Sequence, residues 1–203
     1  IETLVDLLPA TAYTSSTRTG NNTTKQKKPE SSAANLHLLR EMRLCLSRAK
    51  VGVTVTLLTS TAQAWPASKV VVFSSFNTTL DALYTALSNT LLFQHTRTKT
   101  PIAMGYSTNQ RQRTRELYRF RRDPHCRIML ASTNVFATGV DMEFCHGLMI
   151  IEPCWDQTLE TQVLGRQTRI GAVAGQQAIQ LLYTNTLEDR LFYSNRANLT
   201  DFL

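Results

Sequence analysis

The chain has 203 residues, 42% of them hydrophobic, with a net charge of +7 and a pI near 9.5. This length and apolar content allow one good hydrophobic core, so we expect one domain with tails. The excess of lysine and arginine suits a polyanionic partner, although a soluble surface can have the same balance. No apolar run reaches membrane-spanning length.

Four cysteines are present, without CxxC pairing and without a preceding secretory signal, which predicts free thiols in a reducing compartment. The pairs His125-Cys126 and Cys145-His146 abut predicted strands and lack zinc-finger or ribbon spacing, so we expect no metal there. The chain begins at Ile1 rather than methionine, which suggests a piece of something longer.

Residues 1–34 are expected to be a flexible linker. From Thr11 to Ser32 the sequence is rich in Thr, Ser, Asn and Lys and nearly free of large apolar side chains. Such a segment buries too little apolar surface to offset the entropy lost on ordering. Its basic run Lys25-Gln-Lys27-Lys28 is either solvated or a contact for nucleic acid or the nuclear import machinery. The main domain is expected over 35–190, with the start of a closing helix over 191–203.

The first predicted helix runs from Asn35 to Ala49 and is amphipathic. We expect its leucines to pack inward (Leu36, Leu39, Leu44 and Leu46) and its charged residues to face water (Arg40, Glu41, Arg43 and Arg48). The next segment, Val51 to Ser60, is rich in β-branched residues, and its propensity indicates a strand.

A short continuous apolar run, Lys69 to Phe73, is typical of a central parallel strand. Ser74-Ser75-Phe76-Asn77 then forms the turn into a helix over Leu80 to Leu92, with Leu80, Leu83, Leu87 and Leu91 facing inward. Hydroxyl and backbone N–H groups at such a turn can hold a phosphate. Ser75 or Asn77 can also simply cap the helix, and both roles are compatible.

Pro101 to Gly105 is predicted as the next strand, followed by the turn Tyr106-Ser107-Thr108 and a helix from Asn109 to Arg122. That helix carries six arginines: Arg111, Arg113, Arg115, Arg119, Arg121 and Arg122. At a period of 3.6 residues they cannot all face one groove, so most are expected to be solvated or paired. A minority remains available to follow a DNA backbone, with strong salt dependence.

The most informative stretch runs from Arg127 to Gly171. Ile128–Ala131 and Leu148–Ile151 have the length of buried parallel strands, and each leads into a polar segment where an open α/β sheet places its ligand site. Arg166 and Arg169 follow, three residues apart and therefore on one helix face. Paired guanidinium groups suit the charge that spreads over a transferring phosphoryl group.

A last strand over Ala178 to Tyr183 and a helix over Leu187 to Leu203 complete the alternation of strands and helices. This order predicts a doubly wound, mainly parallel α/β sheet.

Several of these segments resemble the sequence motifs of one protein family. Thr133-Asn-Val-Phe-Ala-Thr-Gly-Val-Asp141 resembles motif V of superfamily-two helicases. Glu152-Pro-Cys-Trp155-Asp, Glu160-Thr-Gln162 and Arg166-Gln-Thr-Arg169-Ile-Gly171 resemble the run through motif VI in Swi/Snf-type DNA translocases. Order and spacing together carry the resemblance, which covers Asn35 to the C-terminus and implies the C-terminal RecA-like lobe.

The resemblance implies roles for named residues. Arg166 and Arg169 would be arginine fingers on the γ-phosphate, and Gly139, Asp141 and Gln162 would lie near the nucleotide. The residues implied to contact nucleic acid are Ser74, Ser75, Ser107, Thr108, Arg113, Ser132, Thr133 and Trp155. The competing structural roles are a turn glycine for Gly139, a helix cap for Asp141 and a packed aromatic for Trp155. For the two arginines the alternative is a salt-bridged helix face with Glu160.

The sequence departs from the family pattern at four places: Tyr106 replaces a glycine, Phe136-Ala137 replaces Gly-Gly, and Thr168 and Ala172 replace the usual His and Gln. A tyrosine at the first of these threatens the close backbone approach that glycine allows.

No Gly-x-x-x-x-Gly-Lys-Ser/Thr loop and no Asp-Glu box are present. ATP would therefore be shared with a first lobe, and Mg²⁺ would be held only through that lobe. We expect the second motor lobe of a nuclear, ATP-dependent double-stranded-DNA translocase in chromatin remodelling or DNA repair, inactive as this fragment alone. Its partners would be the first lobe and duplex DNA, with nucleosomes a further candidate.

Two alternatives stay open. A degenerate lobe could serve as a non-hydrolytic binding scaffold, for which the departures at Tyr106, Phe136-Ala137 and Thr168 argue. An RNA helicase lobe fits less well, because the Trp155 region and the closing helix favour the Swi/Snf branch.

Overall fold

The structure is a computed structural model that describes residues 30–93, 101–107, 109–136, 142–166 and 172–200. Its centre is a sheet of five parallel strands in the order β2-β3-β1-β4-β5. The strands are β1 Val70–Ser74, β2 Ile102–Met104, β3 Ile128–Ser132, β4 Gly147–Ile150 and β5 Gln177–Gln180. The strand expected over Leu148–Ile151 thus begins and ends one residue earlier.

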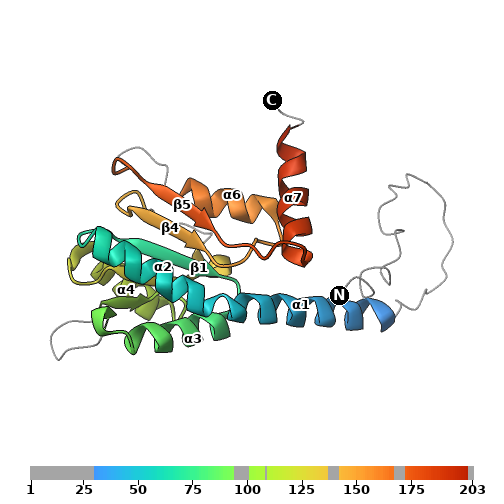
Figure 1. Cartoon of the computed structure of the whole chain (residues 1–203), viewed down its shortest axis with the longest axis horizontal. Coiled ribbons are helices and arrows are strands. Elements are labelled where there is room, and N and C mark those ends of the chain that lie inside the picture. The colour runs from blue at the N-terminus through green and yellow to red at the C-terminus, as the bar shows by residue number, and fades with distance from the viewer. Residues whose placement is uncertain (1–29, 94–100, 108, 137–141, 167–171, 201–203) are drawn as a thin grey trace.

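Helices connect the strands and cover both faces of the sheet (Figure 1). They are α1 Glu30–Ala49, α2 Val51–Ala64, α3 Asn77–Ser88, α4 Gln110–Arg122, α5 Thr133–Phe136, α6 Gln157–Gly165 and α7 Leu187–Thr200, with a 3-10 turn at Leu91–Phe93. The doubly wound, parallel α/β architecture expected from the sequence is confirmed.

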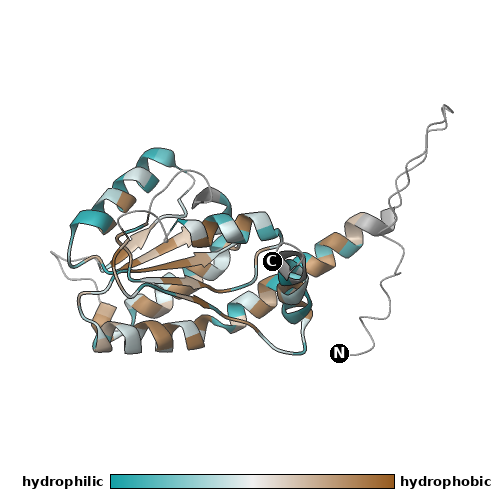
Figure 2. Ribbon diagram, turned by 90° about the horizontal axis from the view of Figure 1, so that it is seen from above, coloured by the Kyte–Doolittle hydropathy of each residue, from teal (hydrophilic) through white to brown (hydrophobic). Residues whose placement is uncertain are grey.

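Strand β1 lies at the middle of the sheet, and each of its two faces contributes to a separate hydrophobic core. Val70 and Val72 point toward α2 and α3, whereas Val71 and Phe73 point to the opposite face, where α4 and α6 pack. Both sides are buried, which is why this strand is a continuous apolar run rather than an alternating one. In Figure 2 the strands are accordingly coloured as hydrophobic.

The strand expected at Val51–Ser60 is wrong, since these residues form helix α2. Its buried positions, Thr54, Leu58 and Ala62, recur every four residues and pack on the α3 side of the sheet. The Thr54 hydroxyl donates to the Lys50 carbonyl at 2.9 Å, so the helix satisfies the hydrogen-bonding group of this buried side chain. Burial of a helical face here outweighs a weak local preference for strand.

Helix α3 ends at Ser88, four residues before the expected end at Leu92. Leu80, Leu83 and Leu87 are buried as expected, but Leu91 is 86% exposed. The chain tightens into the 3-10 turn at this point, and Phe93 enters the core in its place.

Helix α1 begins at Glu30, five residues before the expected start, and its buried face is polar. Leu36 is 59% exposed, whereas Arg43, Ser47 and the adjoining Lys50 are buried. The expectations that Leu36 packs inward and that Arg43 faces water are therefore wrong. This face of α1 meets strand ends whose carbonyls and carboxylates need hydrogen-bond donors, and leucines cannot supply them.

Helix α1 extends beyond the sheet at the end where the strands finish, and α7 stands beside it (Figure 1). Among the described helices, none combines the length and apolar character needed to span a membrane. The carboxyl edge of the sheet is thus bordered by α1 and α7.

Candidate functional site

Glu152 joins the carboxyl ends of β1 and β4. Its carboxylate is buried and accepts hydrogen bonds from the Ser47 hydroxyl at 2.8 Å, the Ser74 hydroxyl at 3.0 Å and the Ser75 backbone N–H. Burial raises the pKa of Glu152, while these hydrogen bonds partly oppose that shift. The turn after β1 is therefore held from inside the fold by a carboxylate.

This arrangement defines the surroundings of Ser74 and Ser75. Ser74 is fully buried as a whole residue, and Phe76 is also buried. Within these three residues only Ser75 is partly exposed and could contact a ligand. The capping alternative is wrong, because Phe76 occupies the N-cap position of α3 and no side chain caps the helix there. The Ser74 hydroxyl instead accepts the Phe76 N–H at 3.1 Å.

Arg43 supports the segment after β4. Its guanidinium donates to the Pro153 carbonyl at 2.7 Å and lies over two rings, Phe76 at 5.8 Å and Trp155 at 5.3 Å. Trp155 itself is 53% exposed. Trp155 is thus exposed to solvent and contacts the Arg43 cation on one ring face, so it is not a core aromatic.

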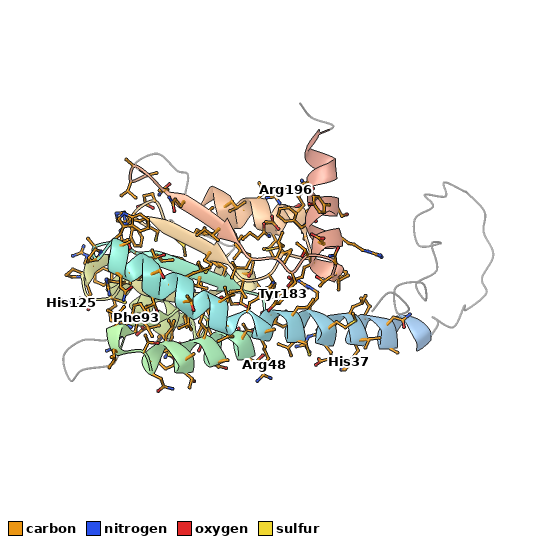
Figure 3. The ribbon with its side chains drawn as sticks, in the orientation of Figure 1. His37, Arg48, Phe93, His125, Tyr183 and Arg196 are labelled. Carbon is orange, nitrogen blue, oxygen red and sulfur yellow. The ribbon has the colours of Figure 1, made fainter. Side chains whose placement is uncertain are left out.

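Lys50 and Glu188 lie deeper at the same edge. The Lys50 ammonium donates to Glu188, to the Ile151 carbonyl at 2.8 Å and to the Leu181 carbonyl at 3.1 Å. It also lies 5.4 Å from the Tyr183 ring, and Figure 3 labels Tyr183 between α1 and α7. Burial lowers the pKa of Lys50, and Glu188 opposes that shift.

The turn after β2 contains Tyr106, the residue that departs from the family glycine. Its ring is buried in the core, and its hydroxyl donates to Asp81 Oδ1 at 2.7 Å. Burial raises the pKa of this hydroxyl, so it stays protonated as a donor. The side chain therefore points into the core.

Ser107 and Arg113 are brought together by this same turn. The Arg113 guanidinium donates to the Ser107 carbonyl at 2.7 Å, and the Ser107 hydroxyl donates to Gln112 at 2.8 Å. The Asn109 side chain caps α4 by accepting the Arg111 N–H at 2.9 Å. Thr108 lies outside the described residues. Arg113 therefore shapes the turn in addition to any ligand role.

Ser132 and Thr133 end β3 and begin α5, and both are buried. Gly139 and Asp141, which follow in the motif V segment, lie outside the described residues, as does Ala137. The described part of this segment resumes at Met142, which is buried in the core on the α4 and α6 side.

Arg166 lies at the C-cap of α6, and its carbonyl accepts the Met142 N–H at 3.1 Å. This bond joins the end of the motif V segment to the start of motif VI. Gln162 is exposed on α6, and Arg169 lies outside the described residues. Glu160, the alternative partner for the arginines, is buried and accepts from the Gln180 amide at 3.1 Å.

Sequence reasoning missed the polar face of α1. Arg43, Ser47 and Lys50 follow the spacing of one helix face, and that spacing is the signal that could have identified them. The residues they contact, Glu152 and Glu188, are more than 100 positions away, as the separations of 105 and 138 show. Only the folded topology brings them together.

The carboxyl edge therefore combines hydroxyl-bearing turns after β1 and β2 with an exposed tryptophan, whereas Arg166 lies at the opposite end of α6, which begins at that edge and runs back along the sheet. Guanidinium and hydroxyl groups bind phosphate oxygens. Within the described ranges, no group of three or more His, Cys, Asp or Glu side chains is placed to hold a metal. The arrangement suits phosphate contacts at the edge of an open sheet.

Fold and edge together define a RecA-like lobe of a superfamily-two helicase. The chain belongs to the helicase conserved C-terminal domain family, which it matches over residues 49–171. The resemblance to Swi/Snf-type proteins is also confirmed by relatives of that type.

Two relatives and one solved structure illustrate the match. The chain is 29% identical to ATP-dependent helicase ULS1 of Saccharomyces cerevisiae, over 61% of this chain and 7% of that protein. It is 26% identical to a putative SWI/SNF-related matrix-associated actin-dependent regulator of chromatin, subfamily A member 3-like 1, of Arabidopsis thaliana, over 70% of this chain and 16% of that protein. The chain thus spans only a small part of either relative.

The solved structure is the C-terminal part of the Fun30 ATPase domain. It superposes with a TM-score of 0.58 at 22% identity, covering 69% of this chain and 43% of that one. This likeness supports the fold assignment.

Proposed function

We propose that this chain is the second motor lobe of an ATP-dependent double-stranded-DNA translocase of Swi/Snf type. The observation that carries the proposal is the 3.1 Å hydrogen bond between the Met142 N–H and the Arg166 carbonyl. It fixes Arg166 beside the end of the segment in which Gly139 and Asp141 are expected to approach a nucleotide. A finger residue needs such fixed placement, because misplacement by about 1 Å can cost 100-fold in rate.

Helix α6 supports Arg166 in this role. Its start is capped by Asp156, whose side chain accepts the Thr158 N–H at 2.8 Å, and Val163 anchors its middle in the core. The helix dipole favours a cation at the C-terminal end, where Arg166 lies. Arg166 and Arg169 would then stabilise the charge that develops on the transferring phosphoryl group.

ATP would be shared between two lobes. This chain would contribute Arg166, Arg169, Gly139, Asp141 and Gln162, while the phosphate loop and the Mg²⁺ ligands would come from a first lobe of the same protein. When bound, ATP supplies the phosphoryl group whose hydrolysis drives the change between open and closed lobes. The cationic end of α6 fits a phosphate at such a shared boundary.

Duplex DNA would contact the turns at the carboxyl edge. The proposed contacts are Ser75, Ser107, Thr108, Arg113 and Trp155. Ser74, Ser132 and Thr133, which the resemblance also implies, are buried and would position these turns rather than touch DNA. The relative named as a regulator of chromatin supports a nuclear protein that acts in chromatin remodelling or DNA repair, with nucleosomes as a further substrate.

The test is the DNA-stimulated ATPase of the full-length protein. We expect Arg166→Ala/Arg169→Ala to abolish most hydrolysis, whereas a matched Arg48→Ala/Arg190→Ala variant, which changes two exposed arginines on α1 and α7, should hydrolyse like wild type. Unchanged hydrolysis in the first variant would show that the finger assignment is wrong.

The same measurement decides the scaffold alternative. If the full-length wild-type protein binds duplex DNA but hydrolyses no ATP, the lobe is a degenerate binding module. The buried position of Tyr106 weakens one reason for that alternative, because the ring packs in the core and its hydroxyl is bound to Asp81.

A further inference from the structure

The arginines of α4 fall into two sets. Arg113, Arg119 and Arg121 are bound to the fold: Arg113 donates to the Ser107 carbonyl, Arg119 to the Ile102 carbonyl and Glu116, and Arg121 to Glu143. These three arginines hold α4 against β2 and the neighbouring loop. Their guanidinium groups are therefore already engaged in contacts with the fold.

The other set forms a stripe along the outside of the helix, which we call the α4 stripe: Arg111, Arg115, Tyr118 and Arg122. Its successive members are four, three and four residues apart, so all four project from one face. All are exposed, and Tyr118 is 58% exposed. Among the described residues, none of the three arginines pairs with a carboxylate.

Tyr118 holds the arginine at one end of the stripe. The Arg122 guanidinium lies 4.7 Å from the centre of the Tyr118 ring. Stacking on an aromatic face restrains the long side chain and leaves its N–H edges available for a further ligand. An ordered guanidinium loses less entropy when it binds an anion than a freely rotating one does.

The stripe's dimensions and position suit a polyanion. From Arg111 to Arg122 it extends roughly 16 Å at 1.5 Å rise per residue, with three permanent charges. DNA carries a charge about every 3.4 Å along each strand, so the stripe spans several phosphates. It starts beside the Ser107 turn and runs toward the far end of the lobe, where Figure 3 labels His125.

We infer that the α4 stripe is a second contact for the phosphate backbone of duplex DNA, continuing from the turn after β2 along the outside of the lobe. This inference rests on the proposed function, because it extends the same DNA interface. An acidic protein segment is the competing occupant. Continuity with the Ser107 turn and the length of the stripe favour DNA, whose charge repeats along its whole length.

The experiment is a salt titration of duplex-DNA binding by the full-length protein, followed by fluorescence anisotropy. The stripe variant is Arg111→Gln/Arg115→Gln/Arg122→Gln, in which glutamine retains helix propensity and removes charge. The control is Arg48→Gln/Arg190→Gln/Arg196→Gln, with the same change in net charge. It includes an exposed arginine, Arg196, that is stacked on Phe192 at 3.5 Å as Arg122 is stacked on Tyr118.

We expect the slope of log affinity against log salt to become shallower by about 2 to 3 units in the stripe variant, at about 0.9 per lost phosphate contact. The slope of the control should match wild type. Equal slopes for the stripe variant, the control and wild type would overturn the inference while leaving the proposed function intact.

A polyglutamate peptide provides the second arm. If the stripe variant keeps the wild-type DNA slope but loses binding to the peptide, the stripe receives an acidic protein and the inference is wrong. If the wild-type protein binds no duplex DNA at all, the proposed function fails, and the inference fails with it.

Discussion

Lys50 and Glu188 form a buried ion pair that connects residues 138 positions apart in the chain. Lys50 lies between α1 and α2, and Glu188 lies in the first turn of α7. The Glu188 carboxylate also accepts the Tyr183 N–H at 3.0 Å. The pair therefore fastens the closing helix to the carboxyl ends of β4 and β5, next to the proposed site.

Removing one partner of this pair should destabilise the fold strongly. Lys50→Met leaves the Glu188 charge buried without its cation, which costs about 3–5 kcal/mol. Lys50→Met/Glu188→Met should recover much of that loss, because no uncompensated charge remains. Urea unfolding measures both, with exposed Arg48→Met as the control, which should stay within about 0.5 kcal/mol of wild type. If Lys50→Met is as stable as this control, the ion pair does not stabilise the fold.

Glu152 predicts a specific pH dependence. Burial raises its pKa in the folded state above that in the unfolded chain, so the folded chain binds more protons as the unfolded chain ionises. Its contribution to stability is present below the ordinary glutamate pKa and is lost as the pH rises through the folded value.

Glu152→Gln, which mimics the protonated side chain, should remove this dependence. We expect wild type to lose stability relative to Glu152→Gln as the pH rises above the ordinary glutamate pKa of about 4.3, as measured by urea unfolding. A stability difference that stays constant with pH, or changes in the opposite direction, would be inconsistent with a raised pKa.

The family glycine should be harmful at position 106 of this chain. Tyr106→Gly removes a buried ring, which costs about 3–5 kcal/mol, and Tyr106→Phe removes only the hydrogen bond to Asp81, which costs about 1 kcal/mol. Exposed Tyr193→Phe is the matched control and should be neutral. Thermal and urea unfolding give the ranking, and a glycine variant as stable as wild type would show that the ring does not support the fold.

The parts of this fold that the sequence predicts are those decided by local pattern. The apolar run at Val70 to Phe73 indicates a central strand, and the alternation of strands and helices indicates a doubly wound sheet. At Val51 to Ser60 the local pattern predicts the wrong element. The β-branched residues favour a strand locally, whereas the buried face of Thr54, Leu58 and Ala62 is set by tertiary packing.

The buried polar edge could not be predicted in the same way. Arg43 and Lys50 are ordinary solvated residues by type, and they become buried only because carbonyls and carboxylates from distant strand ends surround them. The motif residues are easier to predict than this buried edge, because their order along the chain is itself the signal. The positions of Gly139, Asp141 and Arg169 remain expectations, because these residues lie outside the described ranges.

The cysteines should differ in reactivity. Cys45 is exposed, whereas burial raises the pKa of Cys126 to about 11 and of Cys154 to about 12, and also raises that of Cys145. At about pH 8 an alkylating reagent should modify Cys45 in the native protein and the other three only after unfolding. Peptide mapping by mass spectrometry measures this, with Cys45→Ser as the control. Equal labelling of all four in the native state would contradict the burial of these thiols.

The finger assignment is tested most directly by separating kcat from KM for ATP in the full-length protein saturated with duplex DNA. Because an arginine finger acts on transition-state charge, Arg166→Ala should lower kcat by about 1,000-fold or more while KM for ATP changes little. A variant with wild-type kcat, whatever its KM, would contradict the claim that this lobe supplies the catalytic arginine.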